Sequence, residues 1–145
     1  MLDQFLVGGI VSICNITVHA LIMSLVVRAA QAVGAKTTAH PSLRLTGVMI
    51  VTVSVLMGAH AAEVVIWSLA YSILDVAPVG TNLIYFSFVN YTTLGYGDVV
   101  LPLGWRTLGP AESLTGILMC GFSTGLFFAI SHRVLESRMQ RHRKE

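Results

Sequence analysis

The chain alternates long apolar stretches with short polar ones. Residues 4–27, 45–74 and 110–135 are each apolar over about 20 residues or more, the length that a helix needs to cross a bilayer. Residues 82–92 form a shorter apolar and aromatic stretch, which has the length of a re-entrant helix. The pattern therefore predicts an all-α transmembrane fold with three spanning helices and one re-entrant helix.

Polar residues predict where these helices begin and end. Residues 28–44 read as a polar connection after the first span. Thr81 is the expected N-cap of the re-entrant helix. Pro110 suits the first turn of the third span, and Glu112 suits its positive end. A cleavable signal peptide is the competing interpretation of residues 4–27, but no Lys or Arg precedes that stretch.

The basic residues predict the orientation. The first connection carries Arg28, Lys36 and Arg44, and three spans would place it on the same side as the basic chain end. The cations of that chain end are Arg133, Arg138, Arg141, Arg143 and Lys144. Lys and Arg concentrate in cytoplasmic loops, so we expect the N-terminus outside the plasma membrane and a basic cytoplasmic tail, residues 136–145. Anionic lipid head groups are possible partners of this tail and of His132.

Composition narrows the function classes. Hydrophobic residues make up 54% of the 145 residues and charged residues only 11%, which fits one small membrane domain. No nucleophile with a base and no cofactor motif stands out. We therefore expect no enzyme, no resident cofactor and no nucleic-acid partner.

A glycine-rich stretch, TTLGYGD at residues 92–98, follows the predicted re-entrant helix. Irregular backbone at membrane depth is tolerated only when it is covered by protein or lines a water-filled path. Glycine adopts positive φ, which can turn successive carbonyl groups to one side. The stretch therefore predicts a pore lining.

TTLGYGD also resembles the potassium-channel sequence TTVGYGD, with one conservative change at Leu94. The resemblance covers residues 45–135 and leaves residues 1–44 as an additional helix with its connection. It implies an outer helix at 45–74, a pore helix at 82–92, a filter at 93–98 and an inner helix at 110–135. It also implies a homotetramer, because one loop supplies only a quarter of each carbonyl ring around dehydrated K⁺.

The resemblance implies roles for single residues. Backbone oxygens expected to bind K⁺ belong to Thr93, Leu94, Gly95 and Tyr96, and Gly97 and Asp98 would form the outer mouth. The filter support would comprise Tyr85, Phe86, Thr92 and Asp98, with Tyr85 hydrogen-bonded to Asp98 and Tyr96 turned away from the pore. Val89 stands where some relatives carry a buried glutamate.

The third span contains three glycines, Gly116, Gly121 and Gly125. The resemblance implies a gating hinge here, best placed at Gly121, whereas close helix packing through small residues is the equal alternative. Ser123 and Thr124 beside the hinge are expected to face the water-filled cavity.

His60 and Glu63 lie three residues apart in the second span, so they share one helical face. Ionisable groups inside a membrane are costly and suggest function. Three interpretations remain open: a hydrogen-bonded packing pair, a proton-sensing site, or a metal site completed by His19 of the first span.

The sequence thus favours a K⁺-selective tetrameric channel with passive permeation. The alternatives are a non-selective pore, or a non-conducting sensor or assembly module that uses His60 and Glu63.

Overall fold

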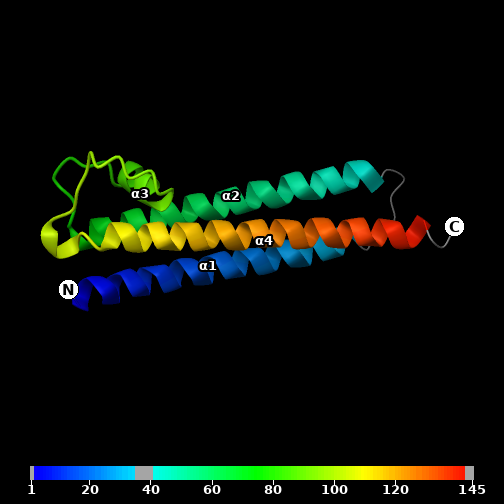
Figure 1. Ribbon diagram of the computed structural model, residues 1–145, viewed down its shortest axis with the longest axis horizontal. Coiled ribbons are helices and arrows are strands. Elements are labelled where there is room, and N and C mark those ends of the chain that lie inside the picture. Colours follow the sequence, from blue (N-terminus) through cyan, green and yellow to red (C-terminus); the bar gives the residue numbers. More distant parts are fainter. Residues whose placement is uncertain (1, 35–40, 143–145) are drawn as a thin grey trace.

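A computed structural model describes residues 2–34 and 41–142 (Figure 1). All regular structure in these ranges is helical. The elements are α1 (Leu2–Gly34), α2 (Pro41–Leu74), α3 (Leu83–Tyr91), the short 3₁₀ helix η1 (Leu103–Trp105) and α4 (Leu108–His142). Three of these helices are long and apolar enough to cross a membrane, which confirms the predicted fold class.

The three long helices lie side by side along the long axis of the molecule (Figure 1). The N-terminus, α3 and the loop after α3 lie at one end, and α4 ends at the other. α1 and α4 therefore run in the same direction, and α2 runs between them in the opposite direction. This places residues 92–98 at the same end as the N-terminus, as three crossings require.

All three long helices extend past their predicted bounds. α1 continues to Gly34 and α2 begins at Pro41, so most of the predicted polar connection, residues 28–44, is helical apart from residues 35–40, which lie outside the described residues. α4 continues to His142, beyond the predicted end at residue 135. The added turns contain Arg, Glu, Met and Gln, which are good helix formers once the helix leaves the apolar layer.

The short helix α3 begins one residue later than predicted. Thr81 as N-cap is wrong, because the Asn82 side-chain oxygen accepts the backbone N–H of Tyr85 at 3.1 Å. An Asn at this position satisfies a donor that the first turn leaves unpaired. The helix ends at Tyr91, with Thr92 as its C-cap.

A seam of small and polar residues joins α1 to α4. Its three side-chain hydrogen bonds are Thr107–Gln4 at 2.6 Å, Ser12–Thr115 at 2.8 Å and His19–Ser123 at 3.2 Å. Partners are separated by 103 or 104 residues at all three levels, as parallel helices in a fixed register require. Such residues allow close approach and polar pairing of helices inside a membrane. The additional helix therefore packs on its own chain.

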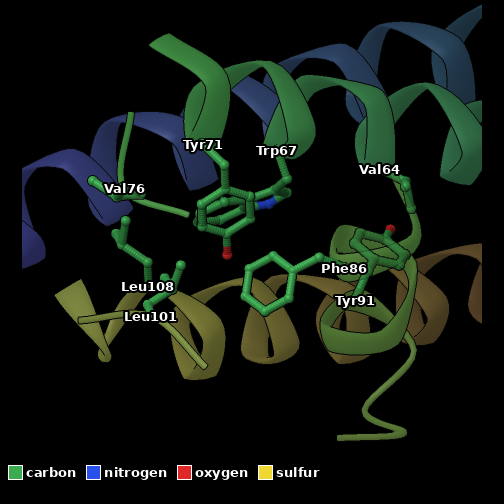
Figure 2. Close-up of a cluster of buried hydrophobic side chains, with 8 residues drawn as sticks. All are labelled: Val64, Trp67, Tyr71, Val76, Phe86, Tyr91, Leu101 and Leu108. Carbon is green, nitrogen blue, oxygen red and sulfur yellow. The ribbon is translucent and has the colours of Figure 1, made fainter. Parts of the chain in front are cut away.

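An aromatic core holds α3 in place (Figure 2). Trp67 and Tyr71 of α2 are buried against α3, and the rings of Tyr71 and Phe86 meet edge to face at 5.0 Å between centroids. Edge-to-face contact is a favoured geometry of aromatic pairs. Phe86, expected to support the filter, therefore packs α3 against α2.

Candidate functional site

The loop after α3 is tied to the end of that helix by its own backbone. The N–H groups of Leu94 and Gly95 both point to the carbonyl oxygen of Val89, at 2.9 and 3.3 Å, and the N–H of Thr93 bonds to the oxygen of Asn90 at 2.9 Å. These bonds satisfy carbonyls that a helix end leaves free. The loop start is thus fixed relative to α3.

Within the loop, φ is positive at every second residue. It is 62° at Thr93, 55° at Gly95 and 75° at Gly97. Glycine adopts such angles freely, but a β-branched residue at positive φ is a genuine outlier. The left-handed conformation costs an ordinary residue about 1–2 kcal/mol, so the strain at Thr93 marks a candidate functional backbone.

The loop end is held by a side-chain contact that the sequence predicts. The Tyr85 hydroxyl donates to Asp98 Oδ2 at 2.8 Å, and Asp98 Oδ1 accepts the N–H of Val99 at 3.1 Å. The hydrogen bond to the Asp98 carboxylate raises the pKa of the Tyr85 phenol, because it favours the protonated form. The Tyr85–Asp98 bond thereby connects the end of the loop to α3.

All of residues 92–98 are exposed in the single chain. Leu94 is 57% exposed and Tyr96 65% exposed. The aromatic shell expected around Tyr96 is therefore not supplied by the described part of its own chain. Two large apolar side chains next to an irregular backbone at membrane depth require a cover.

The three glycines of α4 differ in their surroundings. A Cβ on Gly116 would lie 2.1 Å from the carbonyl oxygen of Tyr91, whereas Gly121 and Gly125 have no atom within 4 Å of such a Cβ. Close packing therefore accounts for Gly116. Gly121 and Gly125 stay hinge candidates.

A buried carboxylic acid lies behind α3, where sequence reasoning did not place one. Glu112 is not in the first turn of α4, which begins at Leu108; it is fully buried. Its oxygens accept the hydroxyl of Tyr71 at 2.7 Å and that of Ser87. Val89 stands where some relatives carry a buried glutamate, whereas Glu112 lies on α4 and bonds to Tyr71 and Ser87.

A second buried cluster joins all four helices near the middle of the bundle. His60 and Glu63 of α2 do meet, at 3.4 Å between His60 Nδ1 and Glu63 Oε2. His19 of α1 joins them, with its Nδ1 2.6 Å from Glu63 Oε1. Tyr91, the last residue of α3, donates its hydroxyl to Glu63 Oε2.

Ser123 of α4 completes this cluster. Its hydroxyl lies 3.0 Å from His60 Nε2 and 3.2 Å from His19 Nε2. The expectation that Ser123 faces a water-filled cavity is wrong, because its hydroxyl finds two imidazole partners inside the bundle, where it is buried. Its neighbour Thr124 is exposed and bonds back to the carbonyl of Cys120.

The spacing of the cluster suits hydrogen bonds better than a metal ion. His19, His60 and Glu63 each offer one ligand atom, and these atoms lie within 4.8 Å of one another. Two ligands at tetrahedral Zn²⁺ are about 3.3 Å apart, since each Zn–N or Zn–O bond is about 2.0 Å. The 2.6 Å between His19 and Glu63 is shorter than that and is an ordinary charge-assisted hydrogen-bond length.

Comparison with known proteins identifies the family. A family model described as "Ion channel" matches residues 59–131, half of the chain, from the middle of α2 to near the end of the apolar part of α4. The chain therefore belongs to this ion channel family. No curated protein and no solved structure matched the chain. The match includes His60, Glu63, Tyr91 and Ser123, whereas His19 lies outside it.

Sequence reasoning missed Tyr91, Ser123 and Glu112 as members of these sites. The sequence nonetheless contains a pattern that marks the packed face of α1. Small and polar residues recur there every three or four positions, at Gln4, Gly8, Ser12, Asn15 and His19. That face is the one that contacts α4.

Proposed function

We propose that the chain is a K⁺-selective channel subunit whose filter is the backbone of residues 93–97. The observation that carries this proposal is the positive φ at Thr93, Gly95 and Gly97. In an ordinary strand successive carbonyls point to opposite sides, whereas alternating left- and right-handed residues turn successive peptide groups the same way. A row of oxygens on one side can replace the hydration shell of a permeating cation.

The position of α3 supports a cation site. The helix ends at Tyr91, directly before the loop, so its negative end lies beside the proposed filter. Helix C-termini carry about half a negative charge and favour cations close to the last turn. The filter and the helix that points to it thus act on the same ion.

The exposure of Leu94 and Tyr96 supports assembly as a homotetramer. One chain contributes one loop, and a closed ring of carbonyls takes four. Neighbouring copies around a central axis would cover the two side chains and leave the backbone oxygens facing the ion path.

We place this channel in the plasma membrane, with the N-terminus and the filter mouth outside. The filter loop and the N-terminus share one end of the bundle, and the positive-inside rule assigns the other end, with Arg133 and the basic tail, to the cytoplasm (Figure 1). Transport would be passive, and no catalytic step or resident cofactor enters the proposal. Anionic lipids at the tail are the expected partners besides the copies of the chain itself.

Flux into liposomes tests the proposal. Purified protein should carry K⁺ and exclude Na⁺, and Gly95→Asp should abolish the flux because position 95 needs positive φ and lies in the filter. Gly104→Asp is the matched control, since Gly104 is exposed in η1, does not have positive φ and lies outside the filter. Equal Na⁺ and K⁺ flux would instead favour a non-selective pore.

A further inference from the structure

The buried cluster in the middle of the bundle is a closed ring of five side chains. In order around the ring they are Glu63, His19, Ser123, His60 and Tyr91, and each is within hydrogen-bond distance of the next. The ring takes one member from α1, two from α2, and one each from α3 and α4. His19, Glu63, Tyr91 and Ser123 are buried, and His60 is 16% exposed.

The ring needs one more hydrogen than its neutral members supply. Five contacts require five hydrogens, one for each pair. A neutral histidine brings one N–H, and serine and tyrosine each bring one O–H, whereas an ionised carboxylate brings none. With Glu63 ionised and both histidines neutral, the ring therefore has four hydrogens for five contacts.

The direction of the Tyr91–Glu63 hydrogen bond determines where in the ring the missing hydrogen is needed. Tyr91 donates to Glu63, so the Tyr91 oxygen must accept from His60 Nδ1 at 2.8 Å. Neutral His60 then has a bare Nε2, which accepts the only hydrogen of Ser123.

His19 must therefore supply both remaining hydrogens. Its Nε2 donates to Ser123 and its Nδ1 donates to Glu63, which is possible only for the doubly protonated, cationic imidazole. His19 and Glu63 are 1% and 0% exposed, so a charge on either requires the opposite charge beside it.

We propose that these five side chains form a proton-binding site that takes up one proton per chain, shared by His19 and Glu63. Uptake completes the ring and neutralises the buried carboxylate. The site lies beside the helix that leads into the filter, since Tyr91 is two residues before Thr93. It does not depend on which ion the filter conducts.

Loss of the proton breaks a defined contact. Neutral His19 keeps its hydrogen on Nδ1, because the alternative leaves the buried carboxylate facing a lone pair. Ser123 then has one hydrogen for two bare imidazole nitrogens, His19 Nε2 and His60 Nε2, so it loses its bond to either α1 or α2, two residues from Gly121. Acid thus completes the bonds of α4 to both α1 and α2, and higher pH removes one of them.

In the described part of the chain, few other titratable side chains could take up this proton instead. On α4, Glu112 and the exposed thiol of Cys120 act electrostatically on Tyr91, and Cys120 and Glu63 act on each other. On α1 and α2, the titratable groups that contact one another at this level are the ring members His19, His60 and Glu63. Glu112 bonds to Tyr71 and Ser87, outside the ring.

Replacement of Glu63 by glutamine gives a sharp test. The introduced side-chain amide would donate to Tyr91, Tyr91 to His60, His60 to Ser123, Ser123 to His19, and His19 to the amide oxygen. All five contacts then have a hydrogen with every group neutral. Glu63→Gln should therefore mimic the proton-bound ring at every pH.

The measurement is the melting temperature of the purified protein in detergent from about pH 5 to about pH 8, with a chelator present. The folded wild type holds one proton that the folded Glu63→Gln variant lacks, whereas the histidines of the two unfolded chains titrate alike. Its stability relative to Glu63→Gln should therefore fall as pH rises, by up to tenfold in the unfolding equilibrium constant per pH unit. Glu136→Gln removes a carboxylate that also faces a histidine, His132 at 3.6 Å, but on the surface, and it should keep the wild-type profile.

Three results would overturn the proposal. One is a wild-type profile parallel to that of Glu63→Gln over the whole range, and another is a Glu136→Gln profile that matches Glu63→Gln. The third is a pH dependence that appears only when the chelator is left out, which would assign the site to a metal. Because no ion flux is measured, failure here leaves the proposed channel function untouched, and failure of K⁺ flux leaves this site untouched.

Discussion

Gly116→Ala tests how tightly α4 is held against the end of α3. The added methyl carbon would lie 2.1 Å from the Tyr91 carbonyl oxygen and 3.0 Å from its carbonyl carbon. Ordinary contact between such atoms needs about 3.5 Å, so the two helices would have to separate by more than about 1 Å. Backbone on both sides cannot move away by a change of side-chain rotamer.

The expected cost follows from that displacement. Overpacking of a tight site costs about 1–3 kcal/mol, and occasionally more, and we expect Gly116→Ala at the upper end because the obstacle is backbone. That corresponds to roughly a 100-fold shift in the unfolding equilibrium. Tyr91 is both the last residue of α3 and a member of the buried ring, so the filter and the ring should both be disturbed.

Reversible unfolding in detergent and K⁺ flux in liposomes measure the two effects. Gly9→Ala is the matched control, because Gly9 is an exposed residue of α1, is not a hinge candidate, and its Cβ would meet no atom within 4 Å in the single chain. Alanine is also the better helix former, so this control should not lower stability. Wild-type stability and flux in Gly116→Ala would refute the packing described for α3 and α4.

Three further predictions concern single hydrogen bonds and the filter. Asp98→Asn should lower the pH at which Tyr85 ionises, because the charged acceptor that raises the pKa of the phenol is gone; an absorbance titration measures this. Tyr71→Phe should destabilise the fold by about 1–3 kcal/mol, measured by unfolding in detergent, because Glu112 loses a buried donor. Leu94→Val should make the proposed filter stiffer and slow any decay of K⁺ current in recordings, because a β-branch restricts χ1.

Each of these has a contradicting result. An unchanged tyrosine titration in Asp98→Asn would show that the carboxylate does not act on the phenol. Wild-type stability of Tyr71→Phe would show that the hydrogen bond from Tyr71 to Glu112 does not stabilise the fold. A sustained wild-type current that Leu94→Val leaves unaltered would show that the side chain behind the proposed filter does not control its rigidity.

The sequence was sufficient for the helices and their order, because spans of apolar residues report directly on membrane crossing. It also placed Tyr85 beside Asp98, since the resemblance supplies that pairing. Helix ends were less predictable. Residues 28–34 were assigned to a connection and residues 136–142 to a polar tail, yet both segments are helical, because a helix ends where its caps and breakers lie and not where the hydropathy changes.

The buried ring could not have been assembled from the sequence. His60 and Glu63 share a face by their spacing, and His19 was grouped with them only in the metal-site interpretation. Ser123 and Tyr91 join them through the packing of α4 and α3 on α1 and α2. Such packing depends on how small and polar side chains fit across two helices. The same packing determines which way the Ser123 side chain points, and residue spacing along one helix cannot predict that orientation.

The reversal potential of single channels in a planar bilayer tests the central claim most directly. With K⁺ at different concentrations on the two sides and Na⁺ balancing the charge, a K⁺-selective filter should reverse near the K⁺ equilibrium potential. That potential shifts by about 59 mV for each tenfold concentration ratio. A reversal potential that stays near zero would contradict a selective filter at residues 93–97.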